Sequence, residues 1–167
     1  ALSSFGAVDG HGEDVDAGQP FRVVVDFAHT AGAMAAVLDG VRFTAPAGAQ
    51  VIVVFGCGGD RDPNRRPLMG EAAAAHADVV VVTSDNPRTE DPLHIVGQVA
   101  AGARAAKELM VEPDRRSAIE LALGRARPGD VVVIAGKGHE TGQIVGDEVL
   151  PFDDREVAVE VLGEVRQ

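Results

Sequence analysis

The side chains best suited to bind a small charged ligand stand in polar segments that each follow a short apolar run. Arg61 and Arg88 come after two of these runs, and guanidinium groups bind carboxylates through paired hydrogen bonds. Asn86 adds a donor and an acceptor, while Asp85 and Glu140 can accept from an ammonium group. This combination suits a ligand with separated ammonium and carboxylate groups, which is an amino acid. The alternative is a solvated loop with surface ion pairs.

A second group of polar residues follows the first apolar run. Asp26 and His29 can hold a ribose, a phosphate or a metal-bound water. The alternative here is a helix cap, with Thr30 as the capping residue and His29 on the surface. A metal site at His139 and Glu140 is disfavoured, because no further spaced His or Cys accompanies them.

The glycine-rich segments do not match the common nucleotide loops. After Gly56 and Gly58, a dinucleotide fingerprint needs a glycine where the chain has Arg61, which argues against a nicotinamide oxidoreductase. Lys137 lacks the upstream glycine and the following hydroxyl of a phosphate-binding loop, so we find no independent ATP triphosphate site. Cys57 has no visible partner base and is expected to be a small buried side chain.

The bulk composition limits the class of protein. The 167 residues are enough for a compact domain with a core. The net charge of −11 disfavours nucleic acid and anionic membranes as partners. A single cysteine fits a reducing cytoplasm, and no apolar run approaches the roughly 20 residues of a membrane span.

The elements that must position these side chains alternate along the chain. Continuously apolar strands followed by helix-period segments predict an α/β fold, a Rossmann-like, doubly wound, mostly parallel sheet with helices on both faces and a C-terminal hairpin. Ligands of such sheets bind beyond the carboxyl ends of the strands. We expect residues 1–19 to enter the domain or link it to a preceding one, and residues 20–167 to form the domain. The expected strands are 22–27, 50–55, 78–83, 109–112 and 130–135, the hairpin is 143–152, and helices start near Pro67, Asp91 and Asp153.

Taken together, these segments resemble the Mur ligase family in its C-terminal domain, over roughly residues 8–160. The similarity rests on ordered motifs at the expected strand ends rather than on any single one. They are Asp26–Thr30, Gly56–Asp62 with Arg66–Gly70, Asp85–Glu90, Gly136–Glu140 and Asp154–Glu156.

The resemblance implies an ADP-forming ligase of peptidoglycan precursor synthesis, and hence a role in cell wall biogenesis, cell shape and cell division. In this family the motif matching Asp85–Arg88 marks users of meso-diaminopimelate, which is added to UDP-N-acetylmuramoyl-L-alanyl-D-glutamate through an acyl phosphate. The nucleotide would lie near Asp26, His29 and His11. The residues implied to bind diaminopimelate are Arg61, Asp85, Asn86, Pro87, Arg88, Gly136 and Glu140.

The resemblance also implies what this chain lacks. ATP and magnesium would be bound mainly by a central domain, with an N-terminal domain for the UDP-sugar dipeptide. No catalytic or metal-binding residue is assigned here, and the chain by itself is expected to be inactive. The family usually has arginine at the position of His11, and Pro and Asp at Ala31 and Gly32. A free-standing amino-acid-binding module without its own ATP loop is therefore the alternative.

Overall fold

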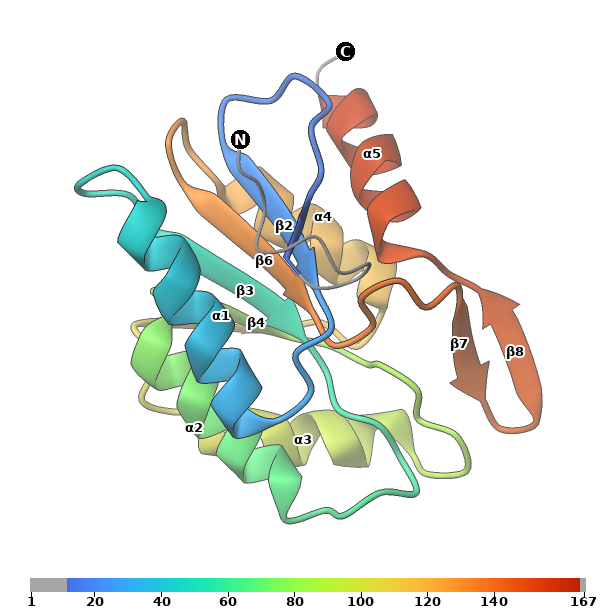
Figure 1. Ribbon diagram of the computed structural model, residues 1–167. Coiled ribbons are helices and arrows are strands. Elements are labelled where there is room, and N and C mark those ends of the chain that lie inside the picture. The colour runs from blue at the N-terminus through green and yellow to red at the C-terminus, as the bar shows by residue number, and fades with distance from the viewer. Residues whose placement is uncertain (1–11, 166–167) are drawn as a thin grey trace.

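The computed structural model describes residues 12–165, and side chains up to residue 164, so His11 lies outside the described residues. Its centre is a sheet in the order β1-β2-β6-β3-β4-β5 (Figure 1). All neighbours are parallel except β1, which pairs antiparallel with β2 at the edge. The strands are β1 Glu13–Asp14, β2 Arg22–Asp26, β3 Val51–Phe55, β4 Val79–Val82, β5 Glu108–Val111 and β6 Val131–Ala135.

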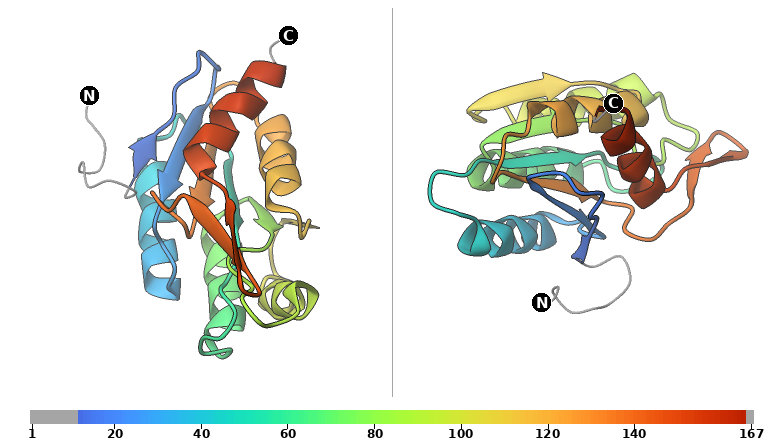
Figure 2. Two further views of the ribbon diagram at one scale, coloured as in Figure 1. Left: turned by 90° about the vertical axis from the view of Figure 1, so that its right-hand side faces the viewer. Right: turned by 90° about the horizontal axis from the view of Figure 1, so that it is seen from above.

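The central strands are buried because helices cover both faces of the sheet (Figure 2). Strands β3, β4 and β6 are buried at every residue, as their unbroken apolar runs predict. Helices α1, α2 and α3 pack on one face, while α4 and α5 pack on the other. The helices are α1 Ala31–Thr44, α2 Arg65–His76, α3 Pro92–Gly102, α4 Arg115–Arg125 and α5 Asp154–Val165. The predicted fold class is therefore confirmed, and no helix in the described range is long and apolar enough to cross a membrane.

Side-chain caps set where several helices begin. The Thr30 hydroxyl accepts from the Ala33 N–H, and Asp91 caps α3 with proline at its first position. Asp153 accepts from the N–H groups of Arg155 and Glu156, which is the Asp153 half of the capping box predicted there. Helix α2 starts at Arg65, two residues before the predicted start near Pro67. Pro67 can lie inside the helix because proline is tolerated in the first helical turn.

Two segments depart from a simple alternation of strand and helix. The predicted linker contains β1, whose Glu13 and Asp14 pair with Val25 and Val24. The predicted hairpin is a separate antiparallel pair, β7 Gly142–Val145 and β8 Glu148–Pro151, which extends beside the carboxyl edge of the sheet (orange in Figure 1).

Candidate functional site

A pocket of about 230 Å³ lies at the carboxyl ends of β2, β3, β4 and β6. Its walls come from loops far apart in the sequence, as expected of a parallel sheet. Pro87 does not line it; its carbonyl oxygen instead packs where a side chain on Gly59 would stand, so only glycine fits that position. The other residues proposed to bind an amino acid all line this pocket: Arg61, Asp85, Asn86, Arg88, Gly136 and Glu140.

The backbone of Arg88 is held by the hairpin. The Arg88 N–H donates to the Ile144 carbonyl at 3.0 Å, and the Gly146 N–H donates to the Arg88 carbonyl at 2.7 Å. Arg88 adopts φ +53°, an uncommon conformation for a residue with a side chain. Its Nη1 donates to the Gly59 carbonyl at 3.0 Å. Arg88 therefore lines the pocket with its backbone held by the hairpin and its guanidinium held by the Gly59 carbonyl.

Asn86 is mainly an anchor for the hairpin. Its Oδ1 accepts from the Ile144 N–H at 2.9 Å and from Lys137 Nζ at 3.1 Å. The amide oxygen was expected to be available to a ligand, and the structure corrects this, because both hydrogen bonds are internal. Among the described residues the amide nitrogen makes no hydrogen bond, so it remains a donor for a ligand. Gln143 supports the same junction by donating to the Asp85 carbonyl at 2.7 Å.

Asp85 already has a cationic neighbour. Lys137 is fully buried, and its Nζ lies 3.2 Å from Asp85 Oδ1 and 3.9 Å from Glu140 Oε1. Asp85 was expected to accept from a ligand ammonium, and the structure shows that the chain already places one ammonium beside it; contact with a ligand stays a prediction. Asp85 Oδ1 is buried and, despite the short ion-pair distance, has no partner in hydrogen-bonding geometry.

The remaining polar groups of the pocket are more open to solvent. Arg61 is exposed, and its Nη1 donates to the Asp60 carbonyl at 3.0 Å. The side chain of Glu140 is 40% exposed, so it can turn toward a ligand. Gly136 adopts φ +115°, which favours glycine, and its N–H donates to the Asp26 carbonyl.

Arg66 fixes the two arginine-bearing loops to one another. It is buried, it pairs with Glu90 at 2.7 Å, and it donates to the Gly58 carbonyl at 3.2 Å. Glu90 also accepts from the Asp60 N–H, and hydrogen bonding by Arg66 holds the pKa of Glu90 below its ordinary value. Arg66 is therefore a structural residue rather than part of a surface ion pair, whereas the neighbouring Arg61 and Arg65 are exposed.

Two of the residues assigned to the nucleotide, Asp26 and His29, follow or end β2 at the carboxyl edge of the sheet. Asp26 is buried and its Oδ2 accepts from the Ala28 N–H at 2.8 Å, while the ring of His29 lies 4.7 Å from that of Phe27. His29 is exposed and lines the pocket that also contains Arg61. The sequence analysis assigned His29 and the arginines to separate groups, whereas the fold brings His29 to the pocket that Arg61 and Arg88 also line. Contact with a nucleotide stays a prediction.

Cys57 also lines the pocket but is not activated. Burial and, to a smaller extent, the nearby Asp85 carboxylate raise the pKa of its thiol to about 12, although Arg66 opposes both. A thiol with so high a pKa carries little thiolate at neutral pH, so Cys57 is not a nucleophile.

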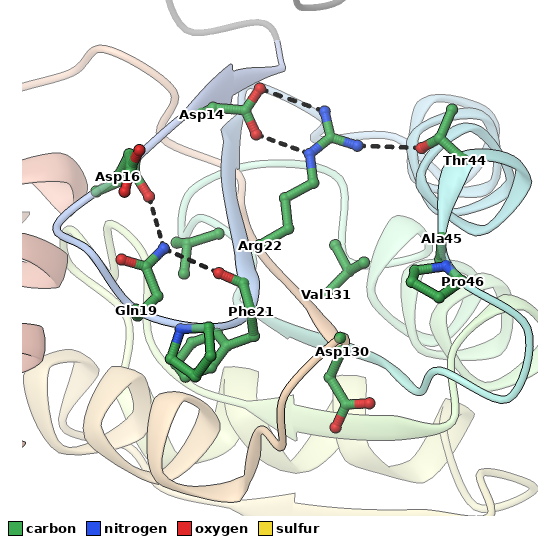
Figure 3. A pocket seen from close by; sticks show the side chains of 14 residues that line it. Asp14, Asp16, Gln19, Phe21, Arg22, Thr44, Ala45, Pro46, Asp130 and Val131 are labelled. Carbon is green, nitrogen blue, oxygen red and sulfur yellow. Dashed lines mark hydrogen bonds and ion pairs between the residues drawn. The ribbon is translucent and has the colours of Figure 1, made fainter.

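A larger pocket, of about 470 Å³, lies at the opposite, amino end of β2 and β6 (Figure 3). There Arg22 Nε donates to Asp14 at 2.7 Å, and Arg22 Nη1 donates to Thr44 at 3.1 Å. Asp130 accepts from two backbone N–H groups at 2.9 Å. Because these polar groups are used within the chain, we place the functional site at the carboxyl edge instead.

The described residues do not fit a magnesium–ATP site. No His, Cys, Asp and Glu side chains within residues 12–164 come together in a group that could hold a metal ion. The pocket at the carboxyl edge is lined by arginines and by carboxylates that are partly or fully exposed, rather than by a phosphate loop.

The sequence analysis did not assign two buried cationic side chains to the site. Lys137 and Arg115 are both fully buried, and both reach the loops at the carboxyl edge. Lys137 was considered only as a possible phosphate ligand. A lysine between two glycines in a strand-end turn gives a weak signal, because the pattern does not show which carboxylate pairs with it.

Known proteins of one family are similar to this chain in sequence and in fold. The family model "Mur ligase, glutamate ligase domain" matches residues 13–138. UDP-N-acetylmuramoyl-L-alanyl-D-glutamate–2,6-diaminopimelate ligases from Solibacter usitatus and Geobacillus thermodenitrificans are each 54% identical, over 96% and 95% of this chain. The chain spans about a third, 32%, of the length of each. A solved structure of a ligase with the same description superposes with a TM-score of 0.87 and 37% identity, covering 98% of this chain and 33% of the other.

Proposed function

The chain belongs to the Mur ligase family through its glutamate ligase domain, and we propose that it is the C-terminal domain of an ADP-forming ligase that uses meso-diaminopimelate. The acceptor would be UDP-N-acetylmuramoyl-L-alanyl-D-glutamate, the substrate named in the curated relatives. The observation that carries this proposal is the convergence of Arg61, Arg88 and Glu140 on one pocket.

The pocket suits one end of diaminopimelate, which has an amino acid group at each end. Arg88 and Arg61 would bind the carboxylate of the distal end, since guanidinium forks match carboxylates. Glu140 would accept from its ammonium, and the Asn86 amide nitrogen adds a further donor. Gripping this end leaves the other amino group free to attack the activated carboxylate of the acceptor. Fixing the amine in place lowers the entropic part of the barrier.

The other substrates would be held mostly outside this chain. ATP and magnesium would bind mainly to a central domain, with Asp26, His29 and His11 on the nucleotide side. The UDP-sugar would bind to an N-terminal domain. The C-terminal domain formed by this chain would close over the ATP as a rigid body. In this arrangement the chain supplies the amine and takes part in peptidoglycan precursor synthesis in the cytoplasm, with consequences for cell shape and division.

The test is phosphate release by the full-length protein with ATP, the UDP-sugar dipeptide and diaminopimelate. We expect release that depends on all three, and far less when lysine replaces diaminopimelate. Release that is equally fast with lysine, or none with either amino acid, would contradict the proposal.

A binding module is the second candidate, because the described residues by themselves form a pocket at the carboxyl edge of the sheet. Calorimetry of the isolated 167-residue chain with diaminopimelate addresses it. Binding by the isolated chain, together with no ADP formation by the full-length protein, would favour this second candidate over the first.

A further inference from the structure

Lys137 places a fully buried positive charge behind the pocket, between the sheet and the hairpin. Its side chain has 0% exposure. Nζ donates to Asn86 Oδ1 at 3.1 Å and to the Gly142 carbonyl at 2.8 Å. These acceptors belong to the β4 loop and to the first residue of β7. One ammonium therefore ties the loop that carries Arg88 to the hairpin that holds the Arg88 backbone.

The same ammonium controls the charge of the pocket. Asp85 Oδ1 lies 3.2 Å from Nζ, and Glu140 Oε1 lies 3.9 Å from it. Charges interact strongly where water is excluded, so Lys137 offsets much of the negative potential of the two carboxylates. Without it, the pocket would attract a ligand ammonium more strongly and would bind a ligand carboxylate less well.

We propose that Lys137 is a positioning residue that determines specificity: by anchoring Asn86 and offsetting Asp85 and Glu140, it makes the pocket select an amino acid whose side chain ends in both an ammonium and a carboxylate over one that ends in an ammonium alone. The inference rests on the proposed function and adds to it. Lysine has the distal ammonium of diaminopimelate but lacks the distal carboxylate, so the two amino acids differ in the group that Arg88 would bind.

The test compares Lys137→Met and Lys137→Gln with the wild type in the full-length protein. The measurement is kcat/KM for diaminopimelate and for lysine, with KM for ATP as an internal check. We expect the ratio of kcat/KM for diaminopimelate to kcat/KM for lysine to fall about tenfold or more, because one charge interaction of this kind is worth a factor of that order. We expect the KM for ATP to stay unchanged, since the hydrogen bonds and ion pairs of the Lys137 ammonium with described residues go to Asn86, Gly142, Asp85 and Glu140 and not to Asp26 or His29.

Lys107→Met is the matched control. Lys107 is 81% exposed and pairs with Asp78, which precedes β4 at the opposite edge of the sheet. This variant removes the same charge without touching the pocket, so its selectivity should equal that of the wild type. A wild-type ratio in both Lys137 variants would overturn the inference. Equal losses for both amino acids, with a lowered melting temperature, would also overturn it, because Lys137 would then be only structural.

Removing one partner of a buried ion pair can prevent folding. If both single variants fail to fold, Lys137→Met with Asp85→Asn decides the question, since it leaves neither charge of the closer pair. In this double variant the ratio of kcat/KM for diaminopimelate to that for lysine should also fall, because Asn86 and Glu140 still lose the Lys137 ammonium. An unchanged ratio overturns the inference. A wild type that releases no phosphate with diaminopimelate instead contradicts the proposed function, so the two failures are distinguishable.

Discussion

Arg115 and Asp154 form a fully buried ion pair although 39 residues separate them in the sequence. Two hydrogen bonds, of 2.8 and 2.7 Å, join the guanidinium to the carboxylate. Arg115 also donates to the carbonyls of Ser84 and Ala135, at the ends of β4 and β6. Burial lowers the pKa of Arg115, but the charge and hydrogen bonds of Asp154, together with the charges of Asp85 and Glu140, outweigh burial and raise this pKa above its ordinary value. The pair thus connects α4 and α5 to the strand ends that carry the pocket.

Breaking this pair should destabilise the protein strongly. Arg115→Met or Asp154→Asn leaves a buried charge without its partner, which costs about 3–5 kcal/mol, and the variant with both substitutions should lose less than the sum of the two. Urea unfolding followed by circular dichroism measures this. The matched control is Arg116→Met with Glu160→Gln, an exposed pair worth about 1 kcal/mol or less. Additive losses at Arg115 and Asp154 would show that they do not act as a pair.

Arg88→Ala in the full-length protein should raise the KM for diaminopimelate. Losing hydrogen bonds to a charged group costs on the order of 1.5–3 kcal/mol, which is roughly 10- to 150-fold. Steady-state kinetics with ATP and the acceptor saturating provides the measurement. Arg104→Ala, which removes an exposed arginine after α3, is the control and should behave as wild type. An unaltered KM in Arg88→Ala would remove this residue from the substrate site.

Cys57 should resist alkylation in the folded protein. With its pKa raised to about 12, the thiolate fraction near pH 8 is about a thousandfold below that of an ordinary cysteine. Iodoacetamide labelling of the full-length protein, followed by mass mapping of the peptide that contains Cys57, measures the rate. The same protein unfolded in guanidinium is the reference, and equal rates in both states would refute the expectation.

The stability contributed by Asp78 should depend on pH. Burial raises its pKa, but hydrogen bonds from the Val51 N–H and Arg42 outweigh burial and lower the pKa below its ordinary value of 3.8. A lowered pKa in the folded state stabilises the protein above the unfolded value, and this contribution disappears as the pH falls through the folded value.

The difference in unfolding free energy between wild type and Asp78→Asn should therefore be constant near neutral pH and should shrink below about pH 4. Chemical denaturation at a series of pH values gives this difference. Asp147→Asn, in the exposed hairpin turn, controls for the loss of one negative charge. A difference that grows toward acidic pH would contradict the assignment.

Local sequence patterns were sufficient to predict the strands of the sheet and the edge at which the candidate binding residues lie. Runs such as Val51–Phe55 and Val131–Ala135 are apolar at every position, which specifies strands buried on both faces. Each is followed by polar residues, and parallel strands bring such ends to one edge. The placement of Arg61, Arg88 and Glu140 around a common pocket therefore follows from the order of strands and helices.

What only the tertiary structure decided is how each charge in that pocket is balanced. Lys137 meets Asn86 across 51 residues because β6 lies beside β3 and β2 rather than at the end of the sheet, and no local pattern fixes that strand order. The same packing turns the Asn86 oxygen toward Ile144 and buries Arg115 against Asp154. Residue type and spacing determine which groups can bind or carry charge. Burial and the nearest partner determine which of them remain available to a ligand, and both depend on contacts between distant segments.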